Sequence, residues 1–369
     1  MVVSVFNGFE GLVKSMYNVF DPELKVTLVE GKTFVPEPDL HASILAIEGV
    51  EAISFVLEEN AILRYEDNEF IARIKGVDAD FLKVSPIDSM MYNGAFALNY
   101  EDEPLAVVGA GIEARLGVRL MSEFNALRIY VPKRTDKVIM NPEQAFNRKS
   151  LKVAGSFSIQ QEFDSKYAFV PLSFARDLLD YENEISAIEI RTVPEVSSFD
   201  VQSEVAELMG ERFKVRDRYQ QNEALYGVMK SEKWVVFALL SFILLIASFN
   251  IIGSLSMLAI EKAKDISTLK TLGMTARNIR QIFMLEGLFS SLIGALGGIV
   301  MAILICVGQQ QFGWVKLQGN GTFVIDAYPV DMEMMDFALV MMIVVGISLL
   351  ASALPAVRAS RQRMVLKEE

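Results

Sequence analysis

The fold is decided by the stretch WVVFALLSFILLIASFNIIGSLSMLAI, Trp234 to Ile260, which carries no charged side chain. Two similar uncharged stretches follow it, Gly287 to Val307 and Phe337 to Val357. A helix needs roughly 20 apolar residues to cross about 30 Å of hydrocarbon, and a soluble helix seldom runs so far without a charge. We therefore expect a membrane protein with three complete transmembrane helices, at 234–260, 287–307 and 337–357.

The charges between these stretches predict the orientation, because short cytoplasmic loops collect Lys and Arg. Basic residues outnumber acidic ones in residues 261–286 and in the tail 358–369, whereas the loop 308–336 holds Lys316 alone against four acidic residues. The first two segments are expected in the cytoplasm and the loop outside it. This orientation places residues 1–232 outside and predicts a multi-pass inner (plasma) membrane protein with a cytoplasmic C-terminus.

The outer portion is acidic and has no cysteine. Residues 1–231 carry 24 Lys and Arg against 37 Asp and Glu, a net charge of 24 − 37 = −13. Such a domain argues against binding to nucleic acid or to an anionic lipid surface, so its partners are expected to be proteins or lipids. The single cysteine, Cys306, lies in the second span, so the outer domain must be held together by its core rather than by disulfides.

The first twenty residues predict a helix with one apolar face, because Val2, Phe6, Phe9, Val13, Met16 and Phe20 recur at spacings of four and three. An exported domain needs a signal peptide or a preceding span, and the first residues show neither. We expect residues 1–20 to be the end of a first span and its stalk helix, in a chain that lacks the rest of that span. The alternative is an ordinary amphipathic core helix.

The outer portion mixes strand and helix signals, which predicts an α+β domain over residues 21–218. A unit of strand, Pro-containing loop, helix and strand occurs near its start and again near its end, so we expect these halves to form one lobe. A second, mainly β lobe is expected at about 85–165, and a helical stalk at 219–233. The expected strands are Leu24 to Val29, Ala52 to Leu57, Ala61 to Tyr65, Phe70 to Gly76, Ala187 to Thr192 and Phe213 to Asp217, and the expected helices are Pro38 to Ile47 and Phe199 to Met209.

Catalytic and metal-binding patterns are absent from the sequence. His41 is the only histidine, and no GxSxG nucleophile motif accompanies it. No GxxxxGK[ST] phosphate loop occurs, and the acidic clusters lack the DxDxDG spacing of a calcium loop. We therefore expect a non-enzymatic chain without a cofactor or metal of its own.

The most distinctive motifs lie between Ile246 and Gly298: FNIIGSL inside the first span and EKAKDISTLKTLGMTARNIRQIFMLEG after it. They resemble the permeases of the lipoprotein-releasing system, the LolC/LolE type, within the FtsX/MacB superfamily. Other blocks resemble the family in the family's order, so the resemblance covers nearly the whole chain. These blocks are Val3 to Glu10, Val107 to Val118, Val153 to Leu179 and Leu354 to Arg361.

The resemblance implies a bundle of four transmembrane helices, the first missing here, with a two-lobed α+β periplasmic domain of the MacB core type. It implies a permease subunit of an ABC transporter whose ATPase is a separate chain of the LolD type, which binds ATP and Mg. Two permease copies, identical or different, would pair with two ATPases. Movement driven by ATP would release lipoproteins from the membrane toward a periplasmic carrier, with membrane lipid as a further partner.

The segment after the first span corresponds to the family's coupling helix, which sits in a groove of the ATPase. We expect a short helix from Ile266 to Leu272 that ends at Gly273, because glycine readily adopts a left-handed cap, and a second helix from about Ala276. Such a helix would present Thr268, Leu269 and Leu272 to the partner, with charged residues that include Lys270 at its rim. The alternative is a simple connector that carries the positive charge of a cytoplasmic loop. The candidate coupling residues are Glu261, Lys262, Asp265, Thr268, Leu269, Leu272 and Gly273.

The segment Pro132 to Arg148 lies between the strands expected at 126–131 and 150–153. It resembles in position the family's hook, a β-hairpin that engages the periplasmic carrier in LolC-type subunits. A plain solvated hairpin is the alternative. The candidate hook residues are Pro132, Val138, Ile139, Met140 and Pro142.

Three residues inside the spans are candidates for packing or for a cargo cavity. Asn250 is a polar side chain in hydrocarbon, where it is costly unless it is bonded to another helix. Gly294 and Gly298 form a GxxxG pattern that allows close helix contact.

Two other functions remain open at this point. A MacB-like efflux permease would normally carry a fused ATPase domain. An FtsX-like regulator of cell-wall hydrolases would typically have a smaller outer domain.

Overall fold

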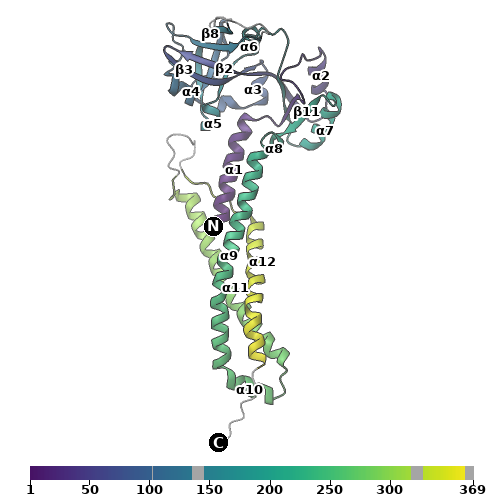
Figure 1. Cartoon of the computed structure of the whole chain (residues 1–369), viewed down its shortest axis with the longest axis vertical. Coiled ribbons are helices and arrows are strands. Elements are labelled where there is room, and N and C mark those ends of the chain that lie inside the picture. Colours follow the sequence, from purple (N-terminus) through teal and green to yellow (C-terminus); the bar gives the residue numbers. More distant parts are fainter. Residues whose placement is uncertain (102, 135–144, 317–326, 362–369) are drawn as a thin grey trace. The chain divides into compact units, whose positions relative to one another are not determined.

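The computed structural model describes residues 1–101, 103–134, 145–316 and 327–361 of the 369-residue chain (Figure 1). The chain forms two compact units. The membrane unit comprises Met1–Leu12 and most of the chain from Gly227 onward, and the domain unit comprises Val13–Tyr226.

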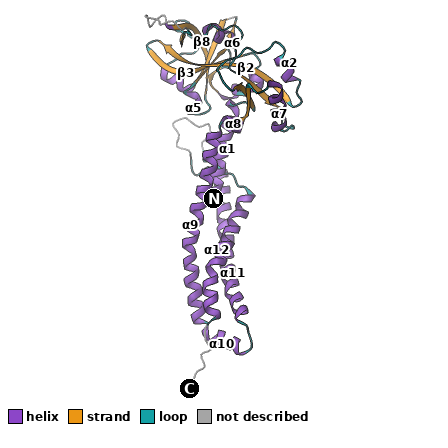
Figure 2. Cartoon of the chain, turned by 45° about the vertical axis from the view of Figure 1, so that its right-hand side comes forward, coloured by secondary structure: helices purple, strands orange, loops and turns teal. Residues whose placement is uncertain are grey.

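Three long helices, α9 (Glu223–Glu261), α11 (Ala276–Phe312) and α12 (Met334–Ser360), run side by side in the membrane unit (Figures 1 and 2). Each is long and apolar enough to cross a membrane, which confirms three such helices over the predicted stretches. Only 11%, 11% and 17% of their most apolar windows is buried within the chain. An uncovered apolar surface of this extent suits hydrocarbon rather than water.

The helix α1 (Val2–Phe20) occupies the predicted residues, but its buried face is partly different. Phe20 is buried as expected, whereas Val2 is exposed and its neighbour Val3 is buried. Near the N-terminal end of α1 a polar contact orients the helix, because Asn7 Nδ2 donates to Asp336 Oδ2 over 2.5 Å. The spacing of apolar residues could not reveal that contact. The expected preceding span stays a prediction.

The domain unit is built on an eleven-stranded sheet in the order β11-β1-β10-β2-β3-β9-β6-β8-β4, with β5 beside β6 and β7 between β2 and β8. The strands are β1 (Leu24–Leu28), β2 (Val50–Tyr65), β3 (Asn68–Val77), β4 (Met91–Gly94), β5 (Asn99–Tyr100), β6 (Glu103–Gly109), β7 (Leu127–Pro132), β8 (Phe146–Phe157), β9 (Tyr167–Pro171), β10 (Ala187–Thr192) and β11 (Phe213–Asp217). The short helices are α2 (Leu40–Leu45), α3 (Phe81–Val84), the 3-10 helix η1 (Ile87–Met90), α4 (Ala110–Leu116), α5 (Gln161–Asp164), α6 (Leu172–Leu178), α7 (Ser198–Met209) and α8 (Arg218–Gln221).

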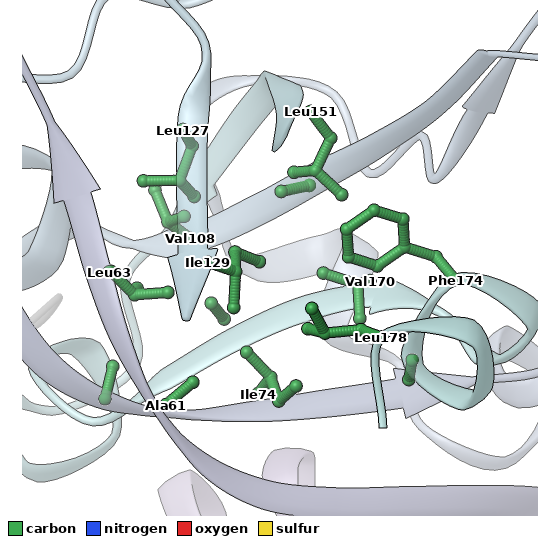
Figure 3. Close-up of a cluster of buried hydrophobic side chains, with 14 of the residues drawn as sticks. Ala61, Leu63, Ile74, Val108, Leu127, Ile129, Leu151, Val170, Phe174 and Leu178 are labelled. Atoms are coloured by element: carbon green, nitrogen blue, oxygen red, sulfur yellow. The ribbon is translucent and has the colours of Figure 1, made fainter. Parts of the chain in front are cut away.

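Six of these strands close into a ring, because β7 pairs with both β2 and β8. The ring runs β2-β3-β9-β6-β8-β7 and returns to β2. Successive residues of a strand point to opposite faces, so alternate side chains fill the interior. There Leu63, Ile74, Ile129 and Val170 point toward one another, and Phe174 of α6 packs beside them (Figure 3).

A second apolar core lies at the other end of the sheet, on β1, β10 and β11. Ile44 of α2 and Val205 of α7 are fully buried there, together with Val26 and Ile188 of the strands. Residues near the start of the domain thus pack with residues near its end. Because β2 contributes to both cores, the sheet is continuous, and the division into two lobes stays a prediction.

The strand predictions near both ends of the domain agree with the structure, but the predicted break between residues 57 and 61 was wrong. β10 and β11 have the predicted bounds, whereas the two strands expected at 52–57 and 61–65 are one strand, β2. Glu58, Glu59 and Asn60 have low strand propensity, yet they pair with β3. The expected stalk helix at 219–233 is interrupted instead, since α8 ends at Gln221 and α9 begins at Glu223.

Four charged side chains meet on the face of the sheet that the end of α1 covers. Lys25 of β1 lies opposite Glu189 of β10, and Glu58 of β2 lies opposite Lys75 of β3. Lys75 Nζ lies 2.8 Å from Glu189 Oε1, and Lys25 Nζ lies 2.9 Å from Glu58 Oε1. Lys75 and Glu189 are fully buried, so each needs the opposite charge, because removing one partner of a buried pair costs about 3–5 kcal/mol.

This network predicts a loss of stability in acid. Burial alone would raise the pKa of Glu58, but Lys25, Lys75 and Arg73 together lower it to about 2 from an ordinary value of 4.5. The stability that the Glu58 carboxylate contributes is therefore complete above about pH 4.5 and is lost as the pH falls toward 2. Glu58→Gln should unfold at a lower temperature than the wild type at neutral pH, and should lose less on acidification.

Thermal unfolding of the purified chain in detergent, followed by circular dichroism across this pH range, measures the difference. The matched control is Glu59→Gln, which removes a neighbouring carboxylate that pairs with Lys32 at 3.5 Å. It should keep the acid dependence of the wild type. Equal acid dependence in the wild type and in Glu58→Gln would contradict the role given to this network.

Candidate functional site

The predicted short helix after the first span is present as α10 (Ala263–Thr271). It begins three residues earlier and ends one residue earlier than expected. Gly273 has a φ of +92°, a left-handed conformation that glycine adopts without strain, so the predicted cap is confirmed. The next helix, α11, begins at Ala276 as predicted, because the Thr275 hydroxyl accepts a hydrogen bond from the Asn278 amide.

The helix α10 is anchored to the ends of the long helices by one apolar and one polar contact. Ile266 is buried in a cluster with Ile279 and Phe283 of α11 and with Ala359 of α12. Lys270 Nζ donates to the Ser360 carbonyl at the end of α12 over 3.0 Å. A cation suits the C-terminal end of a helix, where the carbonyls lack partners and the dipole is negative.

The residues proposed to face a partner differ in exposure. Leu272 is 79% exposed, which is unusual for a large apolar side chain outside the hydrocarbon. Thr268 is also exposed, and Lys262 and Asp265 form a surface ion pair of 3.3 Å beside Glu261. Leu269 is only half-buried.

Leu269 lines a groove of about 370 Å³ that lies between α10 and the neighbouring ends of α9 and α11. The groove has an apolar floor with charged residues among its lining. The lining residues are Leu258, Lys262, Asp265, Ile266, Leu269, Ile279, Ile282, Phe283 and Glu286. The exposed side chains of α10 are therefore polar, and Leu272 adds an exposed apolar side chain directly after the helix, with Leu269 beside the groove. The exposed residues of the helix are Lys264, Asp265, Thr268 and Thr271.

The three candidate residues inside the spans are all exposed on the surface of the membrane unit. A Cβ added at Gly294 or Gly298 would meet nothing within 4 Å, so the predicted GxxxG pattern makes no close helix contact within the described part of this chain. Asn250 lies uncovered on α9. Within the described residues these three therefore show no close helix contact, and their role in packing or toward the cargo stays a prediction.

The close helix contact lies at Gly287 instead. A Cβ there would approach Ser352 Cβ of α12 to 2.7 Å and Leu255 Cδ1 of α9 to 2.9 Å. Ser352 is fully buried, and its hydroxyl donates to the Ser348 carbonyl of its own helix. Both contacting residues, Gly287 and Ser352, are small, which the sequence shows. No GxxxG spacing indicated that they would meet.

The candidate hook lies mostly outside the described residues, which include Pro132 but not Val138, Ile139, Met140 and Pro142. Its base is an antiparallel hairpin of β7 and β8, in which Pro132 lies opposite Phe146. The second strand begins at Phe146 rather than at the expected Ser150. The pairing continues at the Lys133 amide, which donates to the Ala145 carbonyl over 2.8 Å, so the described ends of the segment lie side by side.

Metal-binding side chains do not gather in the described part of the chain. No set of three His, Cys, Asp or Glu side chains there could hold a metal ion. The His41 ring lies edge-on to Phe55, with centroids 5.6 Å apart, which is a packing contact.

Comparison with known proteins gives matches along nearly the whole chain. Residues 237–364 match the family model described as FtsX-like permease C-terminal. The chain is 25% identical to the lipoprotein-releasing system transmembrane protein LolC of Neisseria meningitidis serogroup B, over 98% of this chain and 88% of the relative. It is 23% identical to LolE of Haemophilus influenzae, over 97% of this chain and 88% of the relative. The predicted resemblance is confirmed.

Among solved structures, the chain is distantly similar to the periplasmic region of MacB from Actinobacillus actinomycetemcomitans. The match covers 58% of this chain and 98% of that one, with 11% identity and a TM-score of 0.40. The extracellular domain of the ABC-type transporter YknZ from Gram-positive bacteria covers 53% of this chain, with 12% identity and a TM-score of 0.38.

The position of Gly287 predicts that enlarging it will loosen the membrane unit. Gly287→Val places atoms where Ser352 and Leu255 already lie, and such overpacking typically costs about 1–3 kcal/mol. The thermal unfolding temperature of the detergent-solubilised chain should therefore be lower than that of the wild type. Gly294→Val is the matched control on the same helix, in open space, and should unfold like the wild type. Equal losses in the two variants would contradict the assigned contact.

Proposed function

We propose that this chain, a LolC/LolE-type permease of the FtsX/MacB superfamily, is a membrane subunit of an ABC transporter that releases lipoproteins from the inner membrane. Similarity to LolC and LolE over nearly the whole chain supports the proposal. The structural observation that carries it is α10, which is anchored to the helix ends by Ile266 and Lys270 while Leu272 remains exposed. A helix that is fixed on one side and is followed directly by an exposed apolar side chain suits contact with a second protein.

In this proposal α10 is the coupling helix that enters a groove of the ATPase subunit. Leu272 and Thr268 supply the contact surface, Leu269 its inner edge, and Glu261, Lys262 and Asp265 the charged rim. The left-handed Gly273 turns the chain back toward the membrane. Because α10 is tied to α12 through Lys270 and Ser360, a push on α10 would be passed to the transmembrane helices.

The partners follow from this assignment. Two ATPase chains of the LolD type would bind ATP and Mg, and a second permease, identical or different, would complete the membrane part. The C-terminus and segment 261–286 would lie in the cytoplasm, and residues 21–218 in the periplasm. Asn250, Gly294 and Gly298, exposed in this chain, would then face the second permease or the cargo. The hook, in segment 132–148, would meet a periplasmic carrier through Pro132, Val138, Ile139, Met140 and Pro142.

The finer description of the outer domain belongs to the same proposal. We assign it to the MacB core type, with one lobe around the strand ring and the other around β1, β10 and β11. The two separate apolar cores support this division. Residues 219–233 would form the stalk that leads into the first complete span.

The proposed work is mechanical, and its energetic demand explains the need for ATP. Each methylene buried in the membrane contributes about 0.8 kcal/mol, so an acyl chain with about 15 methylenes is held by roughly 12 kcal/mol. Release without an energy source should therefore be negligible. Catalytic side chains would not be required in this subunit, since its task is to move.

The direct test is release from proteoliposomes. The native transporter, purified through a tag on this chain, is reconstituted with a labelled lipoprotein and a soluble acceptor. Release should require ATP. Leu272→Asp should abolish release and co-purification of the ATPase, while Leu272→Met should preserve both. Neither change should unfold the chain, because substitutions at exposed positions usually change stability by less than about 0.5 kcal/mol.

Two results would count against the proposal. Wild-type transporter that hydrolyses ATP but leaves the lipoprotein in the membrane would favour efflux or cell-wall regulation. Undiminished release by Leu272→Asp would show that α10 is not the coupling helix.

A further inference from the structure

Arg218 holds the end of α1 and the start of α8 together in the domain unit. Its guanidinium donates from Nε to the Asp21 carbonyl over 3.1 Å and from Nη2 to the Asn18 carbonyl over 3.2 Å. The donor and its acceptors are 197 and 200 positions apart in the sequence. One side chain therefore joins the two segments through which the chain enters and leaves the domain unit.

The end of α1 depends on such distant donors. The last carbonyls of a helix have no partner within it, and a positive charge suits the negative end of the helix dipole. Arg218 supplies both a donor and a charge at Asn18. Ser85 serves the next carbonyl, because its hydroxyl donates to the Val19 carbonyl over 2.8 Å. The helix thus ends at a site built by residues of the domain.

Arg218 is itself held by the sheet. Its Nη1 lies 3.6 Å from Glu23 Oε1, and Glu23 Oε2 accepts hydrogen bonds from the amide and the hydroxyl of Thr192 on β10, both over 2.6 Å. Asn222, between α8 and α9, adds a second link, since its Nδ2 donates to Asp21 Oδ2 over 2.5 Å. Polar contacts therefore run without a gap from α1 through Arg218 to the sheet.

An aromatic pocket fixes the same end of α1 from the other side. The Phe20 ring stacks on Phe163 with centroids 4.3 Å apart and lies 4.5 Å from Tyr167. The buried Lys75 Nζ lies 4.8 Å from the Phe20 centroid, where a desolvated cation is attracted to the ring. The end of α1 cannot rotate or slide without breaking both the polar and the aromatic contacts.

We infer that Arg218 is a positioning residue that makes the end of α1 and the start of α8 one rigid joint, through which movement of the membrane helices reaches the periplasmic sheet. The inference rests on the proposed function and adds to it the residue that transmits the movement. A single attached helix could tilt without turning the domain. When α1 and the segment that leads through α8 into α9 are fixed at one joint, they impose their movement on it together.

The test is the amount of lipoprotein released per ATP hydrolysed, measured with the native transporter in proteoliposomes. Arg218→Gln should lower this ratio about tenfold while ATP hydrolysis continues. A tenfold change is near the upper end of the effect that one mutation along a coupling path has on the coupling between two sites. Arg216→Gln is the matched control: Arg216 lies two residues earlier and donates to Thr27 within the sheet, over 3.3 Å. It should leave the ratio unchanged.

A crosslink separates transmission from mere stability. The side chains of Asp21 and Asn222 touch across the joint, so cysteines at these positions are a suitable pair to crosslink, provided that mass spectrometry verifies the disulfide. In a transporter with Arg218→Gln, Asp21→Cys, Asn222→Cys and Cys306→Ser, oxidation should restore release per ATP and reduction should remove it again. A loss caused only by poor folding would not return on oxidation.

The outcomes are distinct. Arg218→Gln with the ratio of the wild type, or a ratio that oxidation of the cysteine pair fails to restore, would overturn the inference while leaving the proposed function intact. A wild-type transporter that releases no lipoprotein would overturn the proposed function and the inference together.

Discussion

The domain depends on the pairing of Lys75 with Glu189, the two fully buried charges of its sheet. Neither could be buried alone, and the pair is balanced by Lys25 and Glu58 on the adjoining strands. Phe20, the last residue of α1, covers Lys75. A helix end thus completes the charge network of the sheet, which explains why the last part of α1 belongs to the domain unit although its first part belongs to the membrane unit.

The membrane unit obeys a different constraint. A chain that crosses hydrocarbon must form helices or closed barrels, because backbone groups have no water to bind there. Long uncharged segments of the sequence therefore suffice to predict α9, α11 and α12. The candidate coupling residues of the membrane unit lie where those helices end. There α10 is fixed by Ile266 and Lys270 and leaves Leu272 uncovered. This arrangement supports the proposal that α10 offers a fixed surface to a partner.

The sequence predicted those features that depend on local pattern. Uncharged length predicted the three long helices, and Gly273 predicted the end of α10 because its left-handed conformation is a local property. Features that depend on contacts between distant residues were missed. Pairing with β3 kept Glu58 within one long strand, and the close helix contact fell at Gly287 rather than Gly294, because facing residues on α9 and α12 decide it. The joint at Arg218 was likewise invisible, since its partners lie about 200 positions away.

Movement of lipoproteins out of the membrane is tested by depleting the chain in its native cell and following the location of acylated lipoproteins by membrane fractionation. If the chain releases lipoproteins, those destined for other sites will accumulate in the inner membrane, and restoring the gene will reverse the accumulation. Normal sorting after depletion would show that the chain does not release them.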